Sequence, residues 1–131
     1  MTLVLADTSV WVAHFRAANP LLQSLLIRDR VLCHPLVLIE LACGTPPAPR
    51  SKTLGELRKL RHAAIATSEE ILSLIETERC YDSGCGATDV ALLSSVLLTR
   101  GARLWTMDKS LAALATRLDI GFEPQNRKPR R

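Results

Sequence analysis

Short runs of apolar residues alternate along the chain with longer stretches in which apolar residues recur every three or four positions. A continuous short run is typical of a strand buried on both faces, and a 3.6-residue period is typical of an amphipathic helix. This pattern predicts strands at 3–6, 31–33, 63–66 and 103–106, with a further edge strand at 120–122. Strands that alternate with helices predict an α/β fold with a parallel sheet.

The helical stretches between these strands carry recognisable start and stop signals. Asn19-Pro20 combines a capping residue with a proline at the first helical position, and Thr67-Ser68-Glu69-Glu70 is a capping box. The predicted helices are 10–17, 20–28, 36–43, 51–60, 71–80, 87–99 and 109–118. In the fifth of these, four apolar residues are expected to face inward: Ile71, Leu72, Leu74 and Ile75.

Two carboxylates directly follow predicted strands. Asp7 ends the run at 3–6, with Thr8 or Ser9 as the expected cap of the next helix, and Asp108 comes just after the strand at 103–106. Open α/β sheets bind ligands at the carboxyl ends of their strands, so both aspartates are expected at the edge where a site would form. The alternative interpretation of Asp7 is a turn or capping residue without chemistry.

Two further carboxylates share helix faces with apolar residues. Glu40 comes three positions after Val37, and Asp89 begins a stripe that continues through Leu92 and Leu93. A carboxylate on a buried face loses much hydration free energy unless it is paired or bound to a cation. The alternatives are an edge position with the head group in solvent for Glu40, and first-turn helix electrostatics on an exposed residue for Asp89.

The chain has 131 residues, of which 47% are hydrophobic, and this is ordinary for one globular domain. We expect that domain at 1–123, followed by a basic, disordered tail at 124–131. The sequence contains neither a membrane span of ~20 apolar residues nor a signal peptide, so a cytoplasmic protein without membrane contact is expected. The cysteines lack zinc-binding spacing and are expected to be buried free thiols, with a Cys80–Cys85 disulfide as the alternative.

The net charge of +4 is concentrated in two stretches. Arg127-Lys128-Pro129-Arg130-Arg131 contains no acid, and the stretch 50–62 holds several lysines and arginines against Glu56 alone. Either stretch would suit the phosphate backbone of a nucleic acid. The alternatives are a solvated helix face and a disordered tail without a ligand.

Four segments contribute the acids singled out above, and a doubly wound sheet would bring them to one edge: Asp7, Glu40, Asp89 and Asp108. If they meet there, repulsion and desolvation would raise their pKa values, and a hard divalent cation would relieve both effects. Oxygen-only ligands favour Mg²⁺, with Mn²⁺ as a substitute, over zinc. Such an ion activates water and stabilises the oxygen that departs from a phosphodiester, so the acids and the basic stretches together predict a nuclease.

The segments that carry these acids resemble the four acidic motifs of PIN-domain ribonucleases. The matching segments are Leu3-Val4-Leu5-Ala6-Asp7-Thr8-Ser9, Glu40-Leu41 with Gly44, Thr88-Asp89 before an apolar helix, and Thr106-Met107-Asp108. Their order and spacing, over residues 3 to about 120, are most similar to the VapC-type toxins of bacterial type II toxin–antitoxin pairs. The chain departs from the family pattern at Gly84-Cys85-Gly86, where a bulkier residue is expected, and this leaves the substrate contacts open.

The resemblance implies a three-layer α/β/α sandwich around a central parallel sheet, and a Mg²⁺-dependent endoribonuclease that hydrolyses RNA with a metal-activated water. It implies Asp7, Glu40, Asp89 and Asp108 as catalytic acids, with Asp7 and Asp89 as metal ligands and Ser9 and Thr106 in support. It also implies a homodimer and an antitoxin that covers the acidic site. The alternatives are a receiver-like magnesium-binding signalling module, disfavoured because Asp7 has no acidic neighbour, and an inactive PIN-like scaffold that binds RNA.

Overall fold

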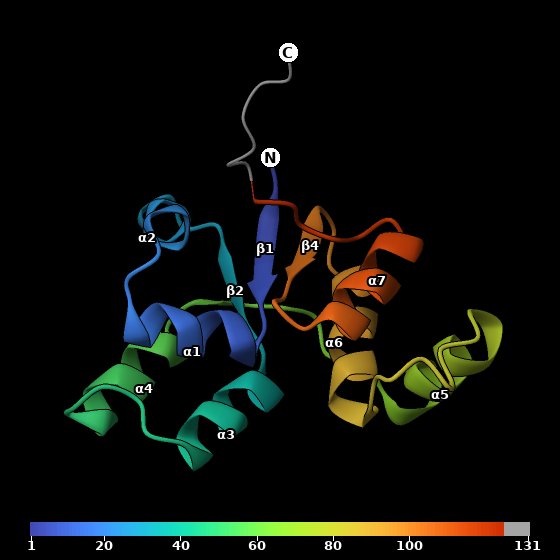
Figure 1. Ribbon diagram of the computed structural model, residues 1–131, viewed down its shortest axis with the longest axis horizontal. Coiled ribbons are helices and arrows are strands. Elements are labelled where there is room, and N and C mark those ends of the chain that lie inside the picture. The colour runs from blue at the N-terminus through green and yellow to red at the C-terminus, as the bar shows by residue number, and fades with distance from the viewer. Residues whose placement is uncertain (125–131) are drawn as a thin grey trace.

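The computed structural model describes residues 1–124, which form four strands and seven helices (Figure 1). The strands are β1 (Leu3–Ala6), β2 (Val31–Cys33), β3 (Arg61–His62) and β4 (Ala102–Trp105). The helices are α1 (Thr8–Arg16), α2 (Pro20–Ile27), α3 (Pro35–Cys43), α4 (Arg50–Arg58), α5 (Ser68–Thr77), α6 (Ala87–Leu98) and α7 (Lys109–Arg117). Each strand is followed along the chain by one or two helices, as the alternating hydrophobic pattern predicts.

The strands form one parallel sheet in the order β3-β2-β1-β4. The chain moves outward from β1 to β2 and β3, and then crosses back to place β4 on the other side of β1. The carboxyl ends of β1 and β4 therefore form a switch point, the place where α/β sheets bind ligands. Ala6 pairs with Trp105, so Asp7 and Thr106, the residues that follow, lie side by side at this edge.

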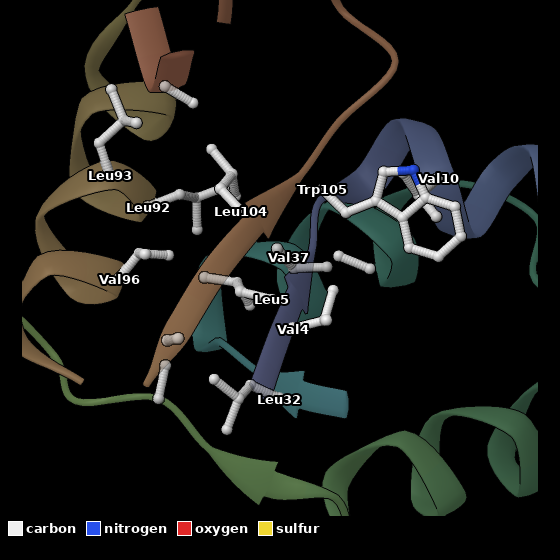
Figure 2. Close-up of a cluster of buried hydrophobic side chains, with 14 of the residues drawn as sticks. Val4, Leu5, Val10, Leu32, Val37, Leu92, Leu93, Val96, Leu104 and Trp105 are labelled. Atoms are coloured by element: carbon white, nitrogen blue, oxygen red, sulfur yellow. The ribbon is translucent and has the colours of Figure 1, made fainter. Parts of the chain in front are cut away.

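Helices cover both faces of the sheet, with α1 to α4 on one side and α5 to α7 on the other (Figure 1). Three consecutive residues of β1 are fully buried at the centre of the core: Val4, Leu5 and Ala6. Figure 2 shows Leu92 and Val96 of α6 near Leu104 on one face of the sheet, and Trp105 beside α1 on the other. The expected three-layer α/β/α sandwich is confirmed.

Most helix ends fall where the sequence signals place them. The side chain of Asn19 caps α2 by accepting hydrogen bonds from the amides of Leu21 and Leu22. Thr67 and Glu70 form the predicted capping box at the start of α5. Each cap satisfies amides that the first helical turn leaves without partners, and this stabilises the fold by about 1 kcal/mol.

Two predictions of secondary structure need correction. The third strand lies at Arg61–His62 and not at 63–66, because backbone pairing with β2 sets this exposed edge strand, not the run of small apolar residues. Residues 120–122 form a single parallel bridge, between Gly121 and Leu104, and not a full strand.

Two side-chain predictions are also wrong. Leu72 is 57% exposed and lies on the solvent side of α5, whereas the other three apolar residues named for this helix contact the core. Helix α1 is capped by Asp7 and not by Thr8 or Ser9, because the Asp7 carboxylate accepts the Val10 amide while both hydroxyls donate to carboxylates.

Within residues 1–124, no helix combines the length and apolarity that crossing a membrane requires. The four cysteines are free thiols. Cys33 and Cys80 are buried as predicted, but Cys85 is half-buried and Cys43 is exposed. The predicted basic tail at 124–131 lies outside the described residues, apart from Pro124.

Candidate active site

The switch point between β1 and β4 gathers the four predicted acids. Asp7 follows β1, Asp108 follows β4, Asp89 lies in the first turn of α6, and Glu40 lies in α3. Burial raises the pKa of Asp89, a hydrogen bond from the Gly86 amide partly lowers it, and the charges of Asp108, Asp7 and Glu40 raise it further. The other three carboxylates therefore lie near enough to Asp89 for their charges to act on it.

Asp7 is the most tightly held of the four acids, with only 6% of the residue exposed. Its Oδ1 accepts hydrogen bonds from Ser9 Oγ at 2.5 Å and from the Val10 amide at 3.2 Å. Its Oδ2 accepts a hydrogen bond from Thr106 Oγ1. Both carboxylate oxygens are thus fixed in direction. Oδ1 already accepts two hydrogen bonds, whereas Oδ2 accepts one and keeps a lone pair for a further partner.

The turn between β4 and α7 fixes the hydroxyls that hold Asp7. The Met107 amide donates to Ser9 Oγ at 2.9 Å, and the Asp108 amide donates to Thr106 Oγ1 at 3.0 Å. Each hydroxyl oxygen accepts a hydrogen bond from an amide, so its own hydrogen is free to donate to the carboxylate. Ser9 and Thr106, predicted to support the site, thereby join the ends of β1 and β4.

Glu40 is exposed, so the prediction of a carboxylate on the buried face of its helix is wrong. The residues of α3 that face the core are Val37 and Leu41. Thr8 Oγ1 donates to Glu40 Oε1 at 2.5 Å and so ties the start of α1 to α3. The sequence did not predict that Thr8 binds Glu40. A threonine directly after the aspartate at a strand end is also a typical helix cap, and this was the role predicted for it.

Three of the acids lie at helix starts, where free amides and the helix dipole stabilise negative charge. Asp7 caps α1, and Asp108 caps α7 by accepting the Ser110 amide at 3.0 Å. Asp89 accepts the Gly86 amide at 3.3 Å in the first turn of α6. These amides explain how the fold tolerates several carboxylates in one place.

The loop before α6 approaches α7 closely at Gly84. Gly84 has a φ of +86°, and a β-carbon there would lie 2.8 Å from Ser110 Oγ, so both backbone angle and space favour glycine. This contact brings the start of α6 beside the start of α7. Burial raises the pKa of the neighbouring Cys85 thiol, a Ser83 hydrogen bond partly lowers it, and the charges of Asp89 and Asp108 raise it.

The donor set suits a hard divalent cation. The two ion pairs within residues 1–124, Lys52–Glu56 and Arg61–Asp29, involve none of the four acids. As the side chains lie, no three histidines, cysteines or acids in the described part of the chain are close enough to hold one ion. The exposed carboxylates of Glu40 and Asp108 would therefore have to turn toward Asp7 and Asp89, which oxygen-only ligation of Mg²⁺ permits.

The basic stretch at 50–62 is partly used to hold the fold together. Arg50 donates to the Ala42 carbonyl at 2.9 Å and to the Gly44 carbonyl at 3.4 Å, which fixes the loop after α3. Lys52 and Arg61 are engaged in the two ion pairs. The surface available to a phosphate backbone is therefore smaller than the count of cations in this stretch indicates.

No family model matches the chain, but the sequence comparison finds relatives and the structure comparison finds a similar fold. The chain is 46% identical over 111 residues to Ribonuclease VapC32 of Mycobacterium tuberculosis, in strains CDC 1551 / Oshkosh and H37Rv. The match covers 85% of this chain and 89% of the relative. A crystal structure of PAE2754 from Pyrobaculum aerophilum matches with a TM-score of 0.57 at 16% identity, over 90% of both chains, and this likeness concerns the fold alone.

Proposed function

The chain belongs to the VapC-type family of PIN-domain ribonucleases, and from this premise we propose that it is a toxin that cleaves RNA internally with Mg²⁺. The observation that carries the proposal is the convergence of Asp7, Glu40, Asp89 and Asp108 at the β1–β4 switch point. These acids have no ion-pair partner within residues 1–124. Membership of this family argues against the alternative of a receiver-like signalling module. The cleavage test below distinguishes the nuclease from an inactive scaffold that binds RNA.

The proposed roles follow from how each side chain is held. Asp7 and Asp89 would be the fixed ligands. Two hydroxyls donate hydrogen bonds to Asp7, and the Gly86 amide at the start of α6 donates one to Asp89. Glu40 and Asp108 are exposed, so either can turn to complete the site or accept the proton of an attacking water. A bound Mg²⁺, or Mn²⁺ in its place, would supply a Lewis acid for the phosphodiester and would lower the pKa of a water.

The proposal includes two protein partners. An antitoxin would cover the acidic site and insert a basic side chain, with arginine favoured because its guanidinium matches a carboxylate in two hydrogen bonds. The support is the absence of an internal cation for the four acids among the described residues. A second copy of the chain would complete a homodimer, which light scattering of the purified protein would measure.

The cleavage test uses purified protein and a mixed pool of RNA with Mg²⁺, with Mn²⁺, or with chelator. We expect cleavage with either ion and none with chelator. Equal cleavage in chelator would refute the metal-dependent mechanism. Binding of RNA without cleavage under every condition would favour the inactive scaffold.

A further inference from the structure

A pocket of about 330 Å³ opens directly beside the acidic site. Val12, Phe15 and Arg16 of α1 line one side, and Glu40 of α3 lines the other together with the loop at 44–47. Glu40 therefore belongs to the pocket and to the acid cluster at once. A strand of RNA with a phosphate at the acids would bring a neighbouring nucleotide to this opening.

The far wall of the pocket is held in place before any ligand arrives. Arg50 fixes the end of α3 through the carbonyls of Ala42 and Gly44, and Thr53 Oγ1 donates to the Pro47 carbonyl at 2.8 Å. Prolines at 46 and 47 stiffen the same loop. A preformed wall loses little conformational entropy when a ligand binds, so the pocket is suited to recognition.

The lining combines the groups that bind a nucleotide. Phe15 and the prolines offer apolar surface to a base, as single-stranded RNA sites commonly do. Arg16 is exposed and makes no hydrogen bond or ion pair with any of residues 1–124, so its guanidinium can meet a phosphate or a base edge. The carboxylate of Glu40 accepts hydrogen bonds and would disfavour a phosphate on its own side of the pocket.

We propose that this pocket binds one nucleotide of a single-stranded RNA, next to the bond that is cut, and reads its base. The inference rests on the proposed ribonuclease activity and adds the specificity-determining site to it. Arg16 is the residue that fixes the nucleotide, and Phe15 and the loop at 44–47 shape the space for the base.

A binding test that needs no cleavage uses amide NMR spectra of the full chain with each nucleoside 5′-monophosphate. We expect the largest shifts at Val12, Phe15 and the loop at 44–47, and about tenfold weaker binding in Arg16→Gln. Arg100→Gln removes the same charge from the exposed turn at the opposite end of the sheet, and should bind as the wild type does. Shifts that avoid the pocket, or that weaken equally in both variants, would overturn the proposal.

A second test maps cut sites in a randomised RNA with Mg²⁺. Wild type should prefer certain bases at a position next to the cut, and both Arg16→Gln and the pocket-filling Val12→Trp should reduce that preference about tenfold. If neither variant changes the preference, the pocket does not read a base of the RNA, and the proposal fails. If wild type cuts no RNA, the proposed function fails, whereas the NMR shifts still decide whether the pocket takes a nucleotide.

Discussion

The β1–α1 junction and the β4–α7 junction share one local plan, a parallel strand followed by an aspartate that caps a helix. Their aspartates nevertheless differ in how they are held. Asp7 is buried and accepts hydrogen bonds from two hydroxyls and an amide. Asp108 is exposed, and its carboxylate accepts one hydrogen bond, from the Ser110 amide.

The difference arises because the two junctions lie side by side. The amides of Met107 and Asp108 orient Ser9 and Thr106, and these hydroxyls then hold Asp7. The β4–α7 junction therefore uses its polar backbone to fix the β1–α1 junction, and its own carboxylate is left free to turn. One rigid and one adaptable acid beside each other are well suited to hold a cation through changes in its surroundings.

The largest expected difference between the junctions is in catalysis. Asp7→Asn should lower kcat/KM for RNA cleavage about a thousandfold or more, because it removes the charge of a ligand whose position is fixed. Asp108→Asn should lower it only about tenfold, since another exposed group or water can take its place. Initial rates of cleavage of one RNA in saturating Mg²⁺ measure kcat/KM for both variants. Equal losses would contradict the proposed difference between Asp7 and Asp108.

The affinity for a metal ion should depend more on the hydroxyl of Ser9, which holds the buried Asp7, than on that of Thr8, which holds the exposed Glu40. Ser9→Ala removes one of the three hydrogen bonds that hold the Asp7 carboxylate, and should weaken Mn²⁺ binding about 10- to 100-fold, as loss of a ligand's supporting hydrogen bond commonly does. Thr8→Ala frees only the exposed Glu40 and should weaken it less than about tenfold. Calorimetric titration gives both constants. A larger effect at Thr8 would show that Glu40, and not Asp7, anchors the ion.

Stability without metal should distinguish the same two aspartates. Asparagine can cap a helix, so Asp108→Asn should change the free energy of unfolding by less than about 0.5 kcal/mol. Asp7→Asn should cost about 1–2 kcal/mol, because a side-chain NH₂ group would face a hydroxyl that has lost its acceptor. Denaturant unfolding in chelator measures the pair, and the comparison would fail if Asp108→Asn were the more costly change.

The smallest expected effect is the pH dependence of metal-free stability. The pKa of Asp89 is raised above its ordinary value of 3.8, so the native state binds this proton more tightly than the unfolded state does. The native state therefore loses stability as the pH rises above that value through the folded pKa. Relative to Asp89→Asn, wild type should become less stable from pH 3.5 to 7, by a few tenths of a kcal/mol after solvent screening. A difference that is constant with pH would contradict the raised pKa.

The sequence was sufficient to predict a parallel sheet with β1, β2 and β4, and the neighbourhood of the acids, because both depend on local patterns. A buried strand followed by an aspartate places Asp7 and Asp108 at one edge once the sheet is parallel. Helical periodicity was less exact for Glu40, which lies about 60° around the helix from Val37 and so reaches solvent at the flank of the buried stripe.

Other features depend on contacts between distant segments and leave no local signal. The bond from Thr8 to Glu40 joins residues 32 positions apart, and the bond from Thr106 to Asp7 joins residues 99 apart. The edge strand β3 follows from backbone pairing with β2 and carries no apolar alternation, since both of its residues are exposed. These features become visible only when the sheet order is known.

The central claim is that the four acids form one cation site, and thermal unfolding of three proteins tests it most directly. Wild type, Asp89→Asn and Asp119→Asn are each unfolded in chelator and in excess Mg²⁺. Asp119 is exposed with a φ of 60°, a backbone conformation that asparagine tolerates, so its variant is a matched control for loss of one charge.

Mg²⁺ should raise the Tm of wild type and of Asp119→Asn, since an ion that binds only the native state stabilises it. Asp89→Asn should be at least as stable as wild type in chelator, because it relieves repulsion and desolvation while its side chain still accepts the Gly86 amide. It should gain nothing from Mg²⁺. An Asp89→Asn protein that is destabilised in chelator and still gains as much from Mg²⁺ as wild type would show that Asp89 is a structural acid and that the site is wrongly assigned.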